Sequence, residues 1–379
     1  MQNSLIFPEN GKLRIMVVSD PQDLKFVRPT MCEMLGKAYD DYKPDLVLFN
    51  GDNILGNHLL DARFGSRKVA EGREATFDAM KKALDKVLEP VNSRKIPFAM
   101  VYGNHDDMNE LTKEEQIEIY RGYEYSMPMN KDDKSVDCDT YAITLNSACG
   151  KPLWAVYMLD SAWQDENGCH TEIKPETVSW FKSTAEKLKK ENGGAPLPGI
   201  ALMHIPLPAI NSLLMPCGKD DANAIKCDDG IYKKLNPVIA KGFMLEPPSI
   251  VETDNGLFDA MKQNTGVKAV VFGHDHSNCF EGSVDGIRIL QTGAASFRCY
   301  GNINTKGVRI IDLDESGSFT SEFLTYYDIM GETPMTKAKY FWDADEYAYK
   351  KYISLGVAAI SAVSITAVKT AKAIIKKRI

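Results

Sequence analysis

The chain has 379 residues, of which 44% are hydrophobic and 26% are charged, and its formal net charge is -7. These values are ordinary for a globular protein that can bury a large core in one to three domains. The acidic balance argues against a broad nucleic-acid-binding surface, and no nucleic-acid-binding module is evident.

The cysteines and the amino terminus indicate an intracellular protein. The eight cysteines form no dense framework, and no two of them have C-x-x-C spacing. We therefore expect reduced thiols, although Cys217 and Cys227 could pair in an oxidising compartment. The amino terminus lacks the basic segment, apolar run and cleavage site of a secretory signal. A cytoplasmic location is expected.

The first third of the chain alternates strands with helices. Apolar, partly β-branched runs predict strands over 13–19, 45–50 and 96–102. Helical spacing predicts helices over 29–42 and 74–91. This alternation is typical of a layered α/β fold, and runs that are apolar on both faces imply a buried sheet.

Two insertions interrupt the later part of the chain. Residues 107–139 contain one predicted helix, 113–123, and are expected to form a rim or lid in which Met127 and Met129 pack. Residues 211–254 form a second, loop-rich insertion. The other predicted elements are strands at 141–145, 153–159, 199–203, 267–272, 278–282, 287–291, 307–312 and 319–324, and helices at 175–190 and 257–263.

The carboxyl terminus differs from the rest of the chain. Residues 353–368 are almost entirely apolar or small, and basic residues follow them. The stretch is shorter than the ~20 residues that span a bilayer comfortably. A peripheral or docked helix is therefore favoured over a tail anchor, and its basic residues suit anionic lipid headgroups. We assign 1–330 to one domain, 331–350 to a linker and 351–379 to a C-terminal apolar and basic helix.

Five polar segments each follow a predicted strand directly. They are rich in Asp, Asn and His, and Asp52 is the best candidate for a carboxylate shared by two ions. Loops at the carboxyl edge of a sheet converge, and this mixture of oxygen and imidazole ligands suits a pair of metal ions. The pattern therefore predicts metal-assisted hydrolysis of a phosphate ester. The segments are Ser19-Asp20-Pro21-Gln22, Gly51-Asp52-Asn53, Gly103-Asn104-His105-Asp106, Met203-His204-Ile205-Pro206 and Gly273-His274-Asp275-His276.

Together, the order of these segments and their strand context resemble the calcineurin-like metallophosphoesterase superfamily, whose motifs read D-x-H, G-D, G-N-H-[DE], H and G-H-x-H. Residues 51–54, 201–208 and 255–258 are similar to its purple-acid-phosphatase-like branch of plant and fungal type. The resemblance covers about residues 12–325, which makes 1–330 a phosphoesterase domain. It implies an α/β fold, a four-layer αββα sandwich with two central mixed β-sheets flanked by helices.

The resemblance also implies the ligands of two divalent ions, manganese, iron or zinc. The first ion would be held by Asp20, Gln22, Asp52 and His276, and the second by Asp52, Asn104, His204 and His274.

Two positions depart from the family pattern. Gln22 stands where the family usually has His, so the first site is expected to bind loosely or to prefer manganese or magnesium over zinc. Leu55 stands where purple enzymes carry a tyrosinate on ferric iron, so a divalent pair is expected.

The expected activity is that of a metal-dependent phosphoric ester hydrolase, in which metal-activated hydroxide attacks a phosphomonoester. His105 is the candidate general acid, and Asp106 could orient its ring or raise its pKa. Arg298 is the candidate for holding a substrate phosphate.

Two alternatives stay open. One is a phosphodiesterase that acts on nucleotide or lipid substrates. The other is a membrane-recruited metal-binding scaffold with little turnover, which Gln22 and residues 353–379 support. His58 and His170 fit none of the motifs and are expected on the surface, and Asp275 is expected only to shape its loop.

Overall fold

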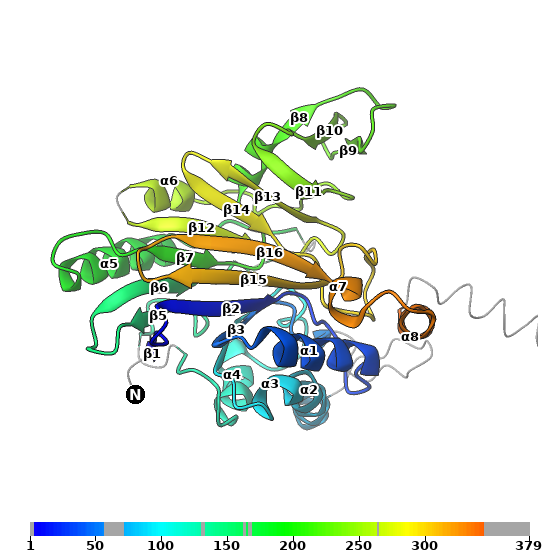
Figure 1. The fold of residues 1–379 in the computed structure, drawn as a ribbon, viewed down its shortest axis with the longest axis horizontal. Coiled ribbons are helices and arrows are strands. Elements are labelled where there is room, and N and C mark those ends of the chain that lie inside the picture. The colour runs from blue at the N-terminus through cyan, green and yellow to red at the C-terminus, as the bar shows by residue number, and fades with distance from the viewer. Residues whose placement is uncertain are drawn as a thin grey trace, which may run out of the picture.

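The computed structural model describes residues 4–56, 72–129, 133–161, 164–165, 169–263 and 265–344. In this part of the chain, two mixed β-sheets pack against each other and helices lie outside them (Figure 1). The predicted C-terminal helix (351–379) and His58 lie outside the described residues.

The smaller sheet carries the three strands predicted for the first third of the chain. Across the sheet, its described strands are β16 (Phe319–Thr325), β15 (Gly307–Asp314), β2 (Lys12–Val18), β3 (Leu46–Asn50) and β4 (Phe98–Val101). Strands β2, β3 and β4 pair in parallel, whereas β15 pairs antiparallel with β2 and β16. Every residue of β3 is buried, as expected for a parallel strand covered on both faces.

The larger sheet is built from the middle of the chain. Across the sheet, its described strands are β1 (Ser4–Ile6), β5 (Tyr141–Asn146), β6 (Pro152–Met158), β7 (Gly199–Leu202), β12 (Val267–Phe272), β14 (Ile287–Gln291), β13 (Cys279–Val284) and β11 (Ala240–Phe243). Its centre, from β6 to β14, is parallel, and its outer pairs include antiparallel ones.

Helices cover the outer faces of both sheets. Helices α1 (Pro29–Tyr42), α2 (Arg73–Val87) and α3 (Glu89–Asn92) pack outside the smaller sheet, and α5 (Pro175–Glu191) and α6 (Leu257–Lys262) pack outside the larger one. Helices α1 and α5 start with a proline and bury residues at helical spacing, which gives each an apolar face. The layers run helix, sheet, sheet, helix, so the predicted four-layer αββα sandwich is confirmed.

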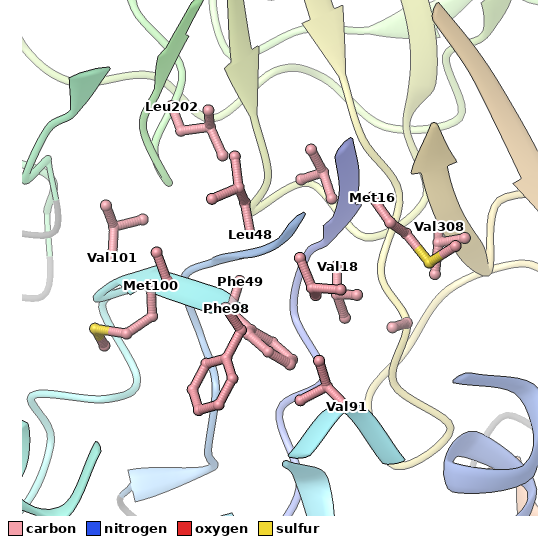
Figure 2. Close-up of a cluster of buried hydrophobic side chains, with 14 of the residues drawn as sticks. Met16, Val18, Leu48, Phe49, Val91, Phe98, Met100, Val101, Leu202 and Val308 are labelled. Atoms are coloured by element: carbon pink, nitrogen blue, oxygen red, sulfur yellow. The ribbon is translucent and has the colours of Figure 1, made fainter. Parts of the chain in front are cut away.

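Two apolar cores hold these layers together. The first fills the space between the sheets and continues under α1 and α2; Figure 2 shows Leu48 of the smaller sheet and Leu202 of the larger sheet in it. The second lies between the larger sheet and helices α5 and α6, where Phe181 packs edge-on against Tyr157 at 5.0 Å between ring centroids. The sheets are therefore fixed relative to each other by close packing.

The two predicted insertions pack against this sandwich. In the first, α4 (Lys113–Arg121) begins with a capping box, and Met127 and Met129 are buried in the core between the sheets. The second contains a 3-10 helix, a small antiparallel sheet and β11, which extends the larger sheet. Its remaining elements are η2 (Pro208–Leu213), β8 (Leu214–Pro216), β9 (Ile225–Lys226) and β10 (Tyr232–Leu235).

The predicted linker at 331–350 contains a helix. Helix α7 (Tyr326–Met330) follows β16, and α8 (Pro334–Asp343) packs against α1. The sequence Thr333-Pro334 is a helix-start signal, because threonine caps a helix and proline suits its first turn. Every helix in the described ranges falls short of the length and apolar character that crossing a bilayer requires.

Candidate metal centre

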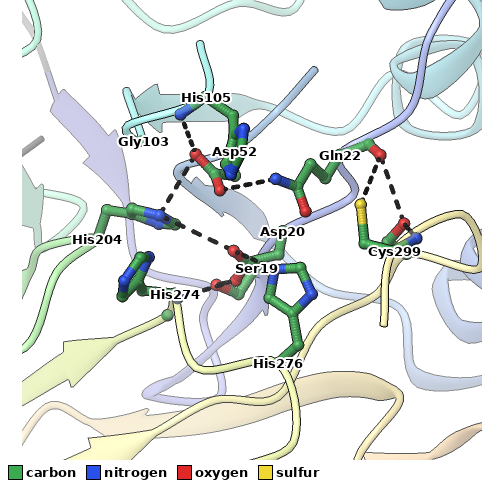
Figure 3. Close-up of polar contacts among 12 residues, drawn as sticks. Ser19, Asp20, Gln22, Asp52, Gly103, His105, His204, His274, His276 and Cys299 are labelled. Atoms are coloured by element: carbon green, nitrogen blue, oxygen red, sulfur yellow. Dashed lines mark hydrogen bonds and ion pairs between the residues drawn. The ribbon is translucent and has the colours of Figure 1, made fainter. Parts of the chain in front are cut away.

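The five polar segments meet at one edge of the two sheets (Figure 3). Asp20, Asp52 and Asn104 follow β2, β3 and β4 of the smaller sheet, and His204 and residues 273–276 follow β7 and β12 of the larger sheet. Because these strands are parallel within each sheet, their carboxyl ends lie at the same edge. The convergence expected from the sequence is present.

Four residues of these segments with side chains have a positive φ angle. The φ angles are 49° at Asp20, 33° at Gln22, 46° at Asp52 and 71° at His274. Such conformations are uncommon for residues with a side chain and cluster at functional sites. Backbone hydrogen bonds hold two of them, from the N–H of Asp20 to the oxygen of Gly51 (3.1 Å) and from the N–H of Gln22 to the oxygen of Asp52 (2.8 Å). Hydrogen bonds between main-chain atoms therefore hold the two loops in place.

Two glycines in the segments are required by close approach. A Cβ on Gly103 would overlap Oδ1 and the backbone nitrogen of Asp52. A Cβ on Gly51, where φ is 85°, would overlap the imidazole of His204. The glycines before Asp52 and Asn104 therefore let the loops come together.

The donor atoms form two overlapping groups. Asp52, His204 and His274 make one group, and Asp20, Asp52 and His276 make the other, with ligand atoms within 4.8 Å of one another in each. Asp52 belongs to both, as a bridging carboxylate must. In addition, Oδ1 of Asn104 lies 3.2 Å from Nε2 of His204, so the amide joins the first group.

The centre concentrates negative charge in a buried place. Asp20 and Asp52 are almost wholly buried, and Oδ1 of Asp52 lies 3.4 Å from Nε2 of His204. Burial opposes protonation of His204, but the charges of Asp52 and Asp20 outweigh it and raise the pKa of His204 to about 10. Burial opposes ionisation of Asp52, yet the imidazoles of His204 and His105 lower its pKa. Both shifts reflect the attraction between the buried imidazole of His204 and the carboxylate of Asp52.

Unused oxygens show that these residues fit metal ions. Oδ1 of Asp20 and Oε1 of Gln22 are buried and accept no hydrogen bond within the described ranges. A buried acceptor without a donor costs free energy, and a cation removes that cost. Carboxylate, amide and imidazole donors together suit manganese, iron or zinc. The residues present therefore fit a pair of divalent ions.

Gln22 makes a contact that a histidine ligand would not make. Its Nε2 donates a hydrogen bond of 3.0 Å to Oδ2 of Asp52, and its Oε1 is the atom left for an ion. The side chain of Leu55 is buried and has no atom that can bind a metal ion, so this position cannot supply a tyrosinate ligand.

His105 lies beside Asp52, and Asp106 has a structural role. The backbone N–H of His105 donates to Oδ1 of Asp52 (2.8 Å), while its Nδ1 has no hydrogen-bond partner in the described part of the chain. The carboxylate of Asp106 accepts N–H groups from Gly103 (2.8 Å), Asn53 (3.1 Å) and Ile54 (3.0 Å). Asp106 thus ties two loops together through backbone hydrogen bonds, and its predicted effect on the ring of His105 stays a prediction.

Arg298 is engaged by the loop that follows β2. Its Nε lies 2.5 Å from Oδ1 of Asp23, and its Nη2 donates to the oxygen of Phe26 (2.7 Å). Both partners of the ion pair are buried. Arg298 therefore holds the loop after β2 through these two contacts, and its predicted role with a phosphate stays a prediction.

His170 reaches the centre, although it was expected on the surface. Its Nε2 lies 2.9 Å from Nε2 of His274, and the two rings meet edge-on with centroids 4.5 Å apart. Burial lowers the pKa of His170 to about 4. No local motif marks this residue, because its segment joins the centre only through the tertiary fold. Asp275, by contrast, accepts a hydrogen bond from the N–H of Ser249 (3.1 Å) and shapes its loop as expected.

Comparisons with known proteins agree with this geometry. A sequence model described as calcineurin-like phosphoesterase matches residues 13–278, a range that contains all five polar segments. The chain is 24% identical over 351 residues to a protein from Arabidopsis thaliana named probable inactive purple acid phosphatase 29, with 83% of this chain and 79% of that protein covered.

Two further similarities have either lower coverage or lower identity. The chain is 27% identical over 271 residues to phosphatase DCR2 from Saccharomyces cerevisiae, which covers 69% of this chain and 39% of that protein. A solved dimetal phosphatase from Danio rerio is 12% identical, with a TM-score of 0.46 and 83% of this chain and 99% of that one covered.

Proposed function

Because the chain belongs to the calcineurin-like phosphoesterase family, we propose that it hydrolyses phosphomonoesters with a pair of divalent metal ions. One observation carries this proposal: two groups of metal-ligand atoms share the single carboxylate of Asp52. A shared carboxylate is what brings two ions close enough to act on one phosphate.

The ions, when bound, would supply positive charge to the phosphoryl group and lower the pKa of a water molecule. Residues of the protein determine where this reaction would take place. Asp52 is held by the N–H of His105 on one oxygen and by Gln22 on the other, so both oxygens have fixed directions. The pocket around Asp20 and Asp52 excludes bulk water, which strengthens each charge interaction.

His105 is the proposed proton donor to the leaving group. Its main chain is fixed on Asp52, its side chain is partly exposed, and its Nδ1 makes no hydrogen bond in the described part of the chain. A partly exposed imidazole beside the bridging carboxylate can supply a proton to the oxygen that departs from phosphorus. This arrangement needs no covalent link between enzyme and phosphate.

The test is a comparison of Asp52→Asn with Asp220→Asn, which changes an exposed aspartate in the second insertion, outside the five segments. Each full-length protein is stripped with chelator and reloaded with manganese, iron or zinc. We expect the parent and Asp220→Asn to hold about two ions per chain and to hydrolyse an aryl phosphate monoester faster than the diester. Asp52→Asn should lose both properties, since it removes the shared charge.

Full activity in Asp52→Asn, or in the parent under excess chelator, would contradict the proposal. A higher rate on the diester would instead favour the phosphodiesterase alternative.

A second candidate is a metal-binding scaffold with little turnover. The hydrogen bond from Gln22 to Asp52 favours it, because that amide occupies the usual place of a histidine ligand. The name of the Arabidopsis relative, probable inactive, points the same way. This candidate gains if the metal-loaded chain hydrolyses no ester and its binding to anionic liposomes depends on residues 353–379, which would be the proposed membrane contact.

A further inference from the structure

In each of the three candidate histidine ligands, one ring nitrogen lies within hydrogen-bond distance of a group that is not a ligand. Nδ1 of His204 lies 2.9 Å from the backbone oxygen of Asn50, and Nδ1 of His276 lies 3.2 Å from the backbone oxygen of Tyr300. A carbonyl oxygen can only accept, so each ring keeps a proton on Nδ1, and Nε2 is the nitrogen left to bind an ion when it gives up any proton of its own. Outer hydrogen bonds of this kind fix the tautomer of a metal-binding histidine.

His274 has a different partner. Its Nε2 lies 2.9 Å from Nε2 of His170, so Nδ1 is the nitrogen left for an ion. His274 belongs to a donor group with Asp52 and His204, whereas His170 belongs to neither group found in the described ranges. His170 therefore contacts a candidate metal ligand and is not itself one of the candidate ligands.

The direction of this hydrogen bond decides whether His274 can bind an ion. A neutral imidazole has one N–H and one acceptor nitrogen. If His170 donated, His274 would carry its proton on Nδ1 and would have no lone pair there. If His274 donates, its Nδ1 is free to bind. Only the second arrangement is compatible with His274 as a ligand.

We propose that His170 is a positioning residue of the metal centre: it accepts the Nε2–H of His274 and so holds that ring with its Nδ1 lone pair toward the ion. The proton of His170 then sits on its own Nδ1, 3.5 Å from the amide nitrogen of Gln164. Rotation of that amide presents its oxygen as the acceptor. The proposal rests on the metal centre of the proposed function, but it does not depend on turnover.

The test compares His170→Phe, which keeps a ring and removes the acceptor, with His170→Gln, which keeps an acceptor oxygen. Cobalt(II) is titrated into each metal-free, full-length protein, and affinity is read by calorimetry and by the visible absorption of the bound ion. We expect His170→Phe to bind the ion about 10–100-fold more weakly, with a changed absorption spectrum. His170→Gln should stay within a few-fold of the parent.

Thermal unfolding in chelator serves as the control for folding, and all three proteins should unfold at the same temperature. Equal affinity in the parent and His170→Phe overturns the inference and leaves the proposed function in place. Equal losses in the two variants also overturn it, because an acceptor would then not matter. If the parent binds no ion at all, the inference and the proposed function both fall.

Discussion

Gln22 is the residue that most affects what this centre can do. Its amide both donates to Asp52 and offers the buried Oε1, so it is a neutral oxygen ligand at best. An amide oxygen binds first-row transition metals more weakly than imidazole nitrogen does. The first ion is therefore expected to be the more loosely held of the two.

Replacing Gln22 with histidine should tighten binding of the first ion about tenfold and raise the rate of ester hydrolysis. Gln22→Asn, which keeps the amide on a shorter arm, is the matched control and should gain nothing. Ion stoichiometry after dialysis and the dissociation constant of the weaker site measure the effect. An unchanged constant in Gln22→His would show that position 22 does not face an ion.

The sequence predicted the site residues that belong to a local motif. It did not predict contacts between residues that lie far apart in the chain. Asp20, Asp52, Asn104, His204, His274 and His276 lie together as expected, because each directly follows a buried strand. Arg298 was assigned to a phosphate, but its ion pair with Asp23 joins residues 275 positions apart. His170 meets His274 across 104 positions. Neither contact can be recognised from the residues that neighbour Arg298 or His170 in the sequence.

Among the elements, helix α1 depends on a residue from the far end of the domain. Arg28, at its N-cap, makes no side-chain capping hydrogen bond. Instead, the buried carboxylate of Asp343 at the end of α8 accepts from the N–H (3.0 Å) and the hydroxyl (2.6 Å) of Thr30. A carboxylate there satisfies a free N–H and opposes the positive end of the helix dipole.

Asp343→Ala should therefore lower the free energy of unfolding by about 2 kcal/mol. Lys339→Gln is the matched control, since it removes only the exposed pair between α8 and Glu33 on α1. That change should cost less than about 0.5 kcal/mol. Urea unfolding of both variants measures the difference, and equal losses would argue against a capping role for Asp343.

The elements that the sequence did not predict are those with weak periodicity or short length. Strand β1 has only three residues, and β11 lies at the edge of its sheet with three of its four residues exposed, so neither shows a buried pattern. Helix α8 falls in the range expected to be a linker, although Thr333 and Pro334 mark its start. The strands of both sheet centres were predictable because burial on two faces leaves an apolar run.

At the scale of the whole molecule, a charged contact joins the two sheets beside their apolar core. Arg309 on β15 is almost wholly buried, and its Nη1 lies 3.4 Å from Oε2 of Glu281 on β13. Burial opposes ionisation of Glu281, but Lys241, Arg288 and Arg309 outweigh it and lower the pKa of Glu281 below its ordinary value of 4.5. Its charge therefore stabilises the fold above about pH 4.5, and this stabilisation is lost as the pH falls through the lowered pKa.

Glu281→Gln should cost about 3 kcal/mol at pH 7, because it leaves Arg309 buried without a counter-charge. The cost should shrink at pH 3.5, where the parent has lost part of the same charge. Glu322→Gln, an exposed change on β16, is the control and should be neutral at both values. Unfolding free energies from urea titrations test this, and a gap that does not change with pH would contradict the assignment.

The candidate ligands of the centre come from both sheets. Asp20, Gln22, Asp52 and Asn104 follow strands of one layer, and His204, His274 and His276 follow strands of the other. Ions bound by both sets would act as non-covalent cross-links between the layers, in addition to any role in chemistry. Removing the ions with a chelator would then also weaken the contact between the two sheets at this edge. Hydrophobic packing would still hold the sheets together elsewhere.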